Sequence, residues 1–206
     1  MGRTGRGRKC AVRGSPRIDP EVPPERTDTR MNSLLILGAG GYGRSVAEAA
    51  RAMGGFDRIA FLDDRLKGED ILGRCVSATE YKGEFRYAYP AFGDNSLRSD
   101  WLKRLERMGY ELPVVKHPRA YISPSARVAP GGVVLAMAAV GTNTAISRGA
   151  IVNMGAIVDH DCTVAACAHI APGAIVKSGN NIPARAKVEA GRVIERGTVF
   201  PKIGNL

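Results

Sequence analysis

The chain has 206 residues, 44% of them hydrophobic, and a formal net charge of +10. No apolar run reaches the roughly 18 residues that a membrane-spanning helix needs, and the N-terminus lacks the apolar segment of a signal peptide, so we expect a soluble, cytoplasmic protein without membrane insertion. The cysteines are too few and too scattered for a disulfide framework or a paired-cysteine zinc site, and we expect them to be reduced: Cys10, Cys75, Cys162 and Cys167.

Residues 1–30 hold eight basic and four acidic residues and so contribute +4 of the net charge. This segment is rich in Gly, Pro and Arg, has no aromatic residue and shows no periodicity, which is typical of a disordered basic leader. Because side chains that stack on bases are absent, a nucleic-acid partner is disfavoured. Met31 directly precedes the first predicted strand, so we interpret the leader as an upstream extension.

Residues 31–118 predict a small Rossmann-like βαβ domain. An apolar run at 34–37 is typical of a buried parallel strand, and Gly38, Gly40 and Gly43 then satisfy a GxGxxG pattern. A helix follows at 45–53, and a second strand at 58–62 ends in Asp63 and Asp64. The glycines would let the backbone approach a phosphate at a helix N-terminus, and the two acids stand where a ribose hydroxyl could sit.

A third strand at 87–92 leads through Asn95 into an amphipathic helix at 96–108. Arg98 lies off the apolar stripe near the start of this helix, where it could meet a phosphate, although a solvated arginine is the commoner case. A last strand is predicted at 112–115, ahead of His117 and Pro118. A domain of roughly 90 residues has room for half of a dinucleotide-binding fold, so a mononucleotide-type ligand fits better than NAD.

The remainder, 119–206, is a repeat in which every sixth residue is large and apolar. A period of six matches neither an α-helix nor a flat strand, but it is typical of a parallel β-helix whose triangular coils each contain three hexapeptides. A second inward position, four residues later, holds small residues up to Ala174, and the rule loosens at Asn180 and Arg192. The large apolar series reads Ile122, Val128, Val134, Val140, Ile146, Val152, Val158, Val164, Ile170, Val176, Ile182, Val188, Ile194, Phe200 and Leu206.

Two histidines fall within this repeat, His160 and His169. His160 is predicted to project outward at a corner of the prism beside Asp161. Asn153, almost half a coil earlier, is a candidate to orient the imidazole across an interface. An outward imidazole next to a carboxylate is a plausible general base, although a solvated surface histidine is the commoner case. The histidines stand nine residues apart and form no close pair, so we expect no metal site. An exposed Cys167 would need a depressed pKa to act as a nucleophile, and nothing in the sequence indicates one.

The ordered combination of these motifs resembles the sugar O-acyltransferase family of hexapeptide-repeat transferases. The motifs are GAGGYG at 38–43, FLDD at 61–64, FGDN with Arg98 at 92–98, HPRAYISPSA at 117–126, NMGAIVDHD at 153–161 and HIAPG at 169–173. The family includes sialic-acid O-acetyltransferases and N-acetyltransferases that act on UDP- or GDP-linked 4-amino sugars. The resemblance covers Met31 to about Gly179.

The resemblance implies a homotrimer of left-handed β-helices, with acetyl-CoA in the groove between neighbouring prisms and the N-terminal domain binding a nucleotide sugar. By this correspondence His160 is the general base, Asn153 positions it and Asp161 is an accompanying acid. His169 corresponds to a histidine near the acetyl thioester, and Gly173, Ser178 and Gly179 are the further coenzyme-binding candidates. The implied nucleotide-sugar pocket consists of Gly38, Gly40, Gly41, Tyr42, Gly43, Asp63, Asp64, Asn95 and Arg98.

The sequence departs from the family pattern at two places. Tyr42 stands where several members have a histidine, which leaves the identity of the acceptor open. After Asn181 the late coils lose the usual Ile-Gly pattern, so coenzyme binding by these coils is the weakest part of the comparison. We expect an acetyl-CoA-dependent acetyltransferase that acts by direct transfer on an amino or hydroxyl group of a nucleotide-activated sugar or of sialic acid. The alternatives are a non-catalytic trimeric nucleotide-sugar-binding or scaffold protein, and an NAD-dependent oxidoreductase that rests on GxGxxG alone.

Overall fold

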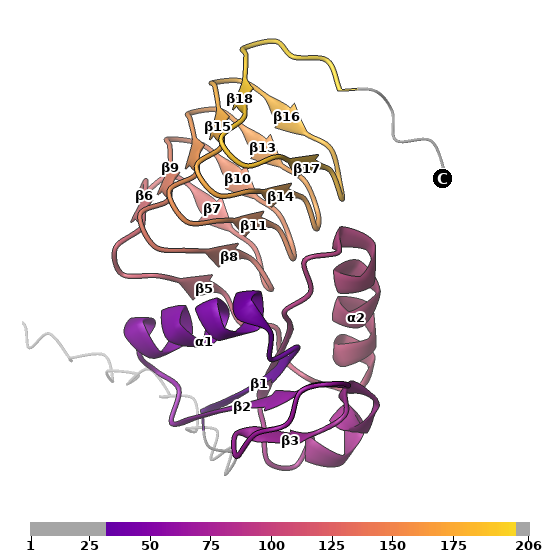
Figure 1. Ribbon diagram of the computed structural model, residues 1–206. Helices are drawn as coiled ribbons and strands as arrows, with labels where there is room; N and C mark the ends of the chain where they lie inside the picture. Colours follow the sequence, from indigo (N-terminus) through magenta and orange to yellow (C-terminus); the bar gives the residue numbers. More distant parts are fainter. Residues whose placement is uncertain (1–31, 201–206) are drawn as a thin grey trace, which may run out of the picture.

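The computed structural model describes residues 32–200, so the predicted disordered leader and the last apolar position, Leu206, lie outside the described residues (Figure 1). The described chain consists of a small α/β region followed by a triangular β-helix, as the sequence predicts. Among these residues no helix is long and apolar enough to cross a bilayer.

The α/β region contains a parallel sheet of four strands in the order β3-β2-β1-β4. Its central strand β1 is covered on both faces, which explains why its sequence is an uninterrupted apolar run rather than an alternation. The chain moves outward from β1 to β2 and β3 and then crosses to the other side of β1, so the strand order reverses between β1 and β4. The elements are β1 (Ser33–Leu37), α1 (Gly41–Met53), β2 (Arg58–Leu62), β3 (Ile71–Gly73), the 3-10 helix η1 (Cys75–Tyr81), β4 (Tyr87–Pro90) and α2 (Asn95–Arg107).

Two details of this sheet differ from the sequence prediction. β3 was not predicted, because three residues carry no recognisable pattern. The strand expected at 112–115 does not join this sheet: Val115, together with Lys116, forms β5 and pairs with β8 of the β-helix. The apolar character of that segment therefore reflects burial under the N-terminal region rather than a fifth strand of the N-terminal sheet.

The β-helix of residues 115–194 has three parallel sheets whose strands pair in register with strands 18 residues away. We call them the docked, open and polar sheets. The docked sheet holds β5 (Val115–Lys116), β8 (Val133–Val134), β11 (Ile151–Val152), β14 (His169–Ile170) and β17 (Lys187–Val188). The open sheet holds β6 (Tyr121–Ile122), β9 (Ala139–Val140), β12 (Ile157–Val158), β15 (Ile175–Val176) and β18 (Val193–Ile194). The polar sheet holds β7 (Arg127–Val128), β10 (Ala145–Ile146), β13 (Thr163–Val164) and β16 (Asn181–Ile182).

The core of the β-helix consists of the predicted sixfold series, since the second residue of each strand from β6 to β18 packs in the core with its counterparts, whereas Lys116 of β5 is exposed. The small inward positions are also filled as predicted, for example by Cys162, whose burial raises its pKa. Asn180 is tolerated inside because its amide donates to the carbonyls of Lys177 and Glu195, whereas Arg192 at a corresponding position is exposed. The ladder continues through β18, so the late coils keep the fold despite their unusual sequence.

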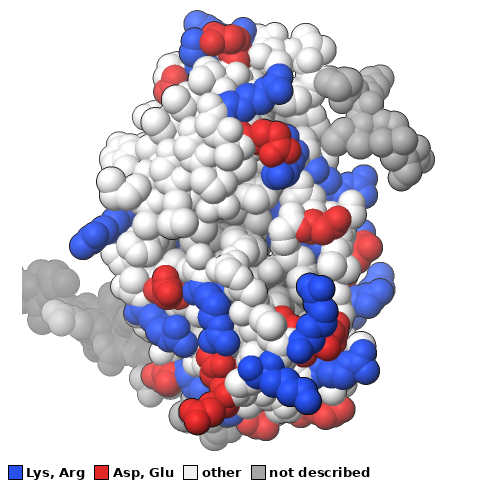
Figure 2. Space-filling view, in the orientation of Figure 1, with Lys and Arg blue, Asp and Glu red and all other residues white. Residues whose placement is uncertain are grey.

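The outward residues give each face of the prism a different character. Those of the docked sheet, such as Val115 and Val133, are buried against the N-terminal region. The polar sheet presents residues such as Arg127 and Thr163. The open sheet instead exposes apolar side chains, namely Tyr121, Ile157 and Val193. In Figure 2 charged side chains are sparse over the region where Figure 1 places β6, β9 and β15.

Candidate active site

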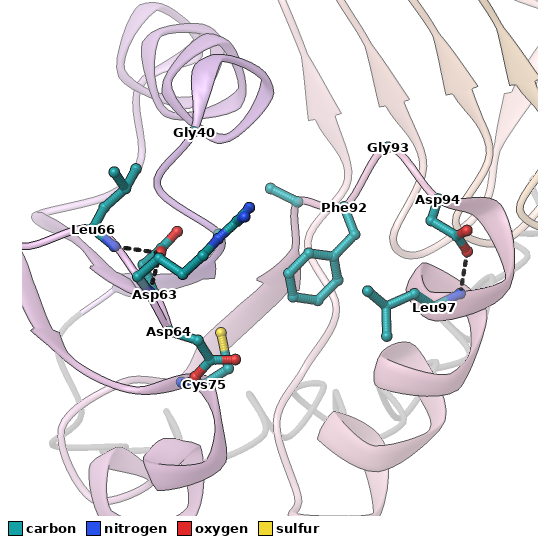
Figure 3. Close-up of a pocket in the computed structure, with 12 residues that line it drawn as sticks. Gly40, Asp63, Asp64, Leu66, Cys75, Phe92, Gly93, Asp94 and Leu97 are labelled. Atoms are coloured by element: carbon teal, nitrogen blue, oxygen red, sulfur yellow. Dashed lines mark hydrogen bonds between the residues drawn. The ribbon is translucent and has the colours of Figure 1, made fainter.

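A cleft of about 440 Å³ lies at the carboxyl ends of β1, β2 and β4, where the strand order reverses (Figure 3). Open α/β sheets bind ligands at such a position. Gly40 and Asp63 line one side of the cleft, and Phe92 and Leu97 line the other. The residues Phe92, Gly93 and Asp94 were not predicted as pocket residues, although their place directly after a strand was a usable signal.

The glycine loop brings the N-terminus of α1 to the cleft. Gly38 has φ +100°, a conformation that side chains disfavour, and a Cβ on Gly43 would lie 1.9 Å from the Gly38 carbonyl oxygen. These two glycines are therefore required for the tight turn and the close helix packing. A Cβ added to Gly40 or Gly41 would meet no atom within 4 Å, so the space beside them is open at the first turn of α1. Free N–H groups at a helix N-terminus favour an anion there.

Asp63 organises the cleft rather than simply lining it. Its carboxylate accepts hydrogen bonds from the backbone N–H groups of Ala39, Arg65 and Leu66, each at 2.8 Å. Partial burial opposes ionisation, but these donors hold the pKa of Asp63 below its usual range. Asp64 accepts from the N–H of Cys75 at 3.0 Å and its side chain is half exposed.

Tyr42 lies at the start of α1 but is not among the residues lining the cleft. Its hydroxyl is 2.7 Å from that of Tyr89, which is fully buried. Burial raises the pKa of Tyr42 well above its usual value and that of Tyr89 to about 12, so both phenols are neutral at physiological pH. The pair joins α1 to β4 within the α/β region.

Arg98 and Asn95 differ most from their predicted surroundings. Arg98 has no exposed surface, and its guanidinium donates to backbone carbonyls of both regions, so it neither lines the cleft nor is solvated. The Asn95 amide donates to the carbonyls of Arg185 and Ala186 on the β-helix. Both residues lie at the junction of the two regions, because α2 packs along the β-helix instead of facing solvent.

His160 lies at the corner between the open and polar sheets, as its spacing predicts, and its side chain is 53% exposed. Its Nδ1 is 2.7 Å from Oδ2 of Asp161, which occupies the left-handed region with φ +55°. The hydrogen bond with His160, followed by that with Asn143, lowers the pKa of Asp161. A Cβ on Gly141 would lie 2.7 Å from the His160 nitrogen, so this corner packs against the previous coil.

His169 and Asn153 form a second polar pair, on the docked side of the prism. Asn153 Nδ2 lies 3.0 Å from His169 Nε2, and both residues are about nine-tenths buried. Burial, followed by the charges of Arg98 and Lys187, lowers the pKa of His169 to about 4. Asn153 was expected to position His160 across an interface, which stays a prediction; within this chain its side chain contacts His169, because Ile151 and His169 are in register on neighbouring coils.

The candidate coenzyme residues divide between two corners. Gly173 follows the docked sheet and continues the corner of Asn153, where its N–H donates to the Met154 carbonyl. Ser178 and Gly179 follow the open sheet and continue the corner of His160, whose carbonyl accepts from the Gly179 N–H. One chain therefore does not bring His160 together with His169, because the open sheet separates the two corners.

The side chains that could ligate a metal are dispersed over the structure. Among residues 32–200, no three or more histidine, cysteine, aspartate or glutamate side chains are grouped to hold an ion. Cys167, which the sequence analysis considered as an exposed thiol, is buried. Cys75 lines the cleft, but burial raises its pKa to about 11.

Residues 33–105 match the model of the PglD N-terminal domain. The acetyltransferase domain of PglB from Neisseria gonorrhoeae, solved with acetyl coenzyme A, is 36% identical over 79% of this chain and 82% of that chain, with a TM-score of 0.74. A mutant of perosamine N-acetyltransferase from Caulobacter crescentus, solved with CoA and GDP-perosamine, is 28% identical over 80% and 89%, with a TM-score of 0.74. WeeI from Acinetobacter baumannii shares the fold, at 21% identity over 80% and 81% and a TM-score of 0.70. The chain therefore belongs to the PglD-like family of sugar acetyltransferases.

Proposed function

We propose that the protein transfers acetyl directly from acetyl-CoA to an amino or hydroxyl group of a nucleotide-activated sugar or of sialic acid. The observation that carries this proposal is the exposed His160 with its Nδ1 held 2.7 Å from Asp161. An imidazole oriented in this way presents Nε2 to a substrate, as a general base requires. Relatives solved with acetyl-CoA and with GDP-perosamine support the choice of substrates.

The nucleotide part of the acceptor is proposed to bind in the cleft of the α/β region. The open space beside Gly40 and Gly41 at the start of α1 suits the phosphates, since backbone N–H groups there favour negative charge. The half-exposed Asp64 is placed to accept a hydrogen bond from a ribose hydroxyl or a base N–H. Arg98 and Asn95 have no such role in this proposal.

In the transfer step, the acceptor nitrogen or oxygen attacks the thioester carbonyl while His160 Nε2 removes its proton. A C–N or C–O bond forms, the tetrahedral intermediate collapses with cleavage of the C–S bond, and the thiolate of CoA takes the proton from the imidazolium. Asp161 stabilises the imidazolium in between, because its low pKa keeps it ionised. No covalent acyl-enzyme is required.

His169 and Asn153 are proposed to lie at the thioester end of the coenzyme, with Gly173 on the same corner. Because its pKa is near 4, His169 is neutral during turnover and carries a single ring proton. A neutral, buried and hydrogen-bonded pair offers fixed dipoles to the developing oxyanion without a mobile charge. Ser178 and Gly179, on the corner of His160, are proposed to contact the coenzyme from the other side.

We propose a homotrimer in which one active site uses two chains. His160 and His169 flank the open sheet of the same prism, so they can share a site only when the His160 corner of one copy approaches the His169 corner of another. The exposed apolar side chains of the open sheet, including Tyr121 and Ile157, suit such a contact. Patches of this kind commonly mark subunit interfaces.

Acetyl-CoA consumption measured against UDP- and GDP-linked amino sugars and sialic acid tests this function. We expect turnover with one member of the panel and heat of binding on calorimetric titration with acetyl-CoA. If the protein shows no turnover and does not bind acetyl-CoA, the result supports the scaffold alternative, in which the prism only assembles a trimer.

A further inference from the structure

Helix α2 lies along one corner of the β-helix, the corner between the polar and docked sheets (Figure 1). We call this corner of the β-helix the α2 corner. One residue of each coil turns the chain there with positive φ, and these residues stand 18 positions apart: Gly131, Gly149, Cys167 and Arg185. The helix rises 5.4 Å per turn and neighbouring strands are about 4.8 Å apart, so successive turns of α2 meet successive coils.

The contacts between α2 and the α2 corner follow this similarity between the helix pitch and the spacing of the coils. Leu102 packs so closely that a Cβ on Gly149 would lie 2.3 Å from its Cδ1. One turn earlier Arg98 reaches two coils, and Asn95 reaches the next one. At the far end Glu106 forms an ion pair with Arg148 at 2.6 Å. The helix is therefore registered against the coils from its first residue to its last turn.

Arg98 is the centre of this contact. Nε donates to Gly149 O at 3.0 Å, Nη2 donates to Cys167 O at 2.7 Å, and Nη1 donates to Phe92 O at 2.9 Å. No carboxylate among the described residues hydrogen-bonds to this buried guanidinium; carbonyls and the Asn95 side chain satisfy it. A planar fork of donors fixes the relative placement of its acceptors, which a single ammonium group cannot do.

These acceptors belong to the two halves of the proposed active site. Phe92 lines the nucleotide cleft, and Cys167 precedes His169 by two residues. Asn95 makes a second connection between α2 and the strand of His169. The carbonyl of Ala186 accepts a hydrogen bond from the Asn95 amide at 3.2 Å and another from the backbone N–H of His169 at 2.9 Å. Side chains of α2 thus bind two carbonyls next to His169: that of Cys167, two residues before it, and that of Ala186, which accepts from its N–H.

We propose that Arg98, assisted by Asn95, is a positioning residue for acetyl transfer that fixes the nucleotide cleft relative to His169. This rests on the proposed function, because only a reaction between groups bound at these two places needs a fixed separation. Arg98 touches neither ligand in this proposal. A shift of about 1 Å between reacting groups can cost roughly 100-fold in rate, so a loosened junction should act on turnover more than on binding.

The test compares Arg98→Met, Arg98→Lys and Asn95→Ala with Arg107→Met, which removes an exposed arginine from the last turn of the same helix. We expect Arg98→Met to lower kcat at least about tenfold while the KM for the acceptor and the Kd for CoA change less than threefold. Arg98→Lys should restore part of the turnover, Asn95→Ala should lose less than Arg98→Met, and Arg107→Met should match the wild type.

Nitrogen NMR of the histidine rings gives a readout that a general loss of stability would not move selectively. The chain has only three histidines, so the spectrum is simple. In Arg98→Met the His169 ring resonances should shift, and their titration midpoint should rise because a nearby positive charge is lost; Lys187 and Glu189 remain as the other charged neighbours. His160 should be unchanged, because it lies on a different corner.

A folded Arg98→Met protein with kcat within twofold of the wild type and unmoved His169 resonances would overturn the proposal. If Arg98→Met does not fold, Asn95→Ala takes its place in the test, and its kcat and the position of its His169 resonances decide the outcome. The two proposals fail in different ways. A wild-type protein that transfers no acetyl group would refute the proposed function. The NMR spectra need no acceptor, so the His169 shift would still report whether Arg98 positions that residue.

Discussion

The imidazole of His160 and the carboxylate of Asp161 are adjacent in sequence and meet at 2.7 Å because Asp161 takes a left-handed backbone conformation at a coil corner. This geometry turns both side chains outward from the same corner. It also means that two neighbouring residues, rather than a long-range constellation, supply the proposed base and its orienting acid.

Replacement of the base should abolish most of the catalysis without affecting assembly. We expect His160→Ala to lower kcat by about 10²–10⁴-fold, the range that general-base assistance supplies. His117→Gln is the control variant: His117 directly follows β5 in the first coil, accepts from the N–H of Arg119 and has no part in the proposed transfer, so kcat should stay near the wild-type value. A His160→Ala protein that retains full turnover would contradict the assignment; initial rates with acetyl-CoA measure the outcome.

The orienting acid should matter less than the base. Asp161→Asn keeps the size of the side chain but removes the charge that stabilises the imidazolium, so we expect kcat to fall by roughly tenfold or more, yet by less than in His160→Ala. Initial rates with acetyl-CoA, measured as for His160→Ala, give the size of the effect. An Asp161→Asn protein with the kcat of the wild type would remove Asp161 from the mechanism.

The free energy of unfolding should depend on pH, because His169 is neutral in the folded chain. Its pKa is about 4 in the folded chain against an unfolded value near 6.5, so the unfolded state binds the proton first as pH falls. The free energy of unfolding should therefore decrease between pH 6.5 and 4, by at most about 3 kcal/mol. Urea titrations at one protein concentration should show this slope in the wild type and a smaller one in His169→Gln. Equal slopes would indicate that His169 is readily protonated in the folded state.

The glycines of the loop should divide into structural and binding positions. Gly43→Ala places a methyl group against the Gly38 carbonyl and should destabilise the fold by about 1–3 kcal/mol or more. Gly40→Ala meets no atom within 4 Å and should preserve the melting temperature while weakening the binding of UDP or GDP. A Gly40→Ala protein that binds nucleotide as the wild type does would move the phosphates away from this loop.

The sequence predicted most of the fold because each coil repeats one simple rule. The sixfold series placed inward residues such as Val140 and Ile170 correctly, and it placed His160 outward at a corner. The same period, carried one coil further, places Ile151 beside His169, since residues 18 apart lie in register. Asn153 and His169 are 16 residues apart, so their side-chain contact follows from the turn after the strand and not from the period alone.

The junction could not be predicted in the same way. Whether Arg98 meets solvent, phosphate or protein depends on how α2 packs against carbonyls 51 and 69 residues further along the chain. The Tyr42–Tyr89 pair likewise joins residues 47 positions apart on different elements. No local pattern encodes such contacts, because they arise from the packing of two regions whose relative placement the sequence motifs do not specify.

The most direct test of a site shared between copies is complementation of two inactive chains. His160→Ala and Asn153→Ala proteins, each of low activity, are co-expressed so that mixed trimers form. If His160 of one copy acts beside Asn153 and His169 of another, about a quarter of the sites in a random mixture are intact, and activity should return to about that fraction of the wild type. Activity that stays at the average of the two separate variants would contradict a site built from two chains.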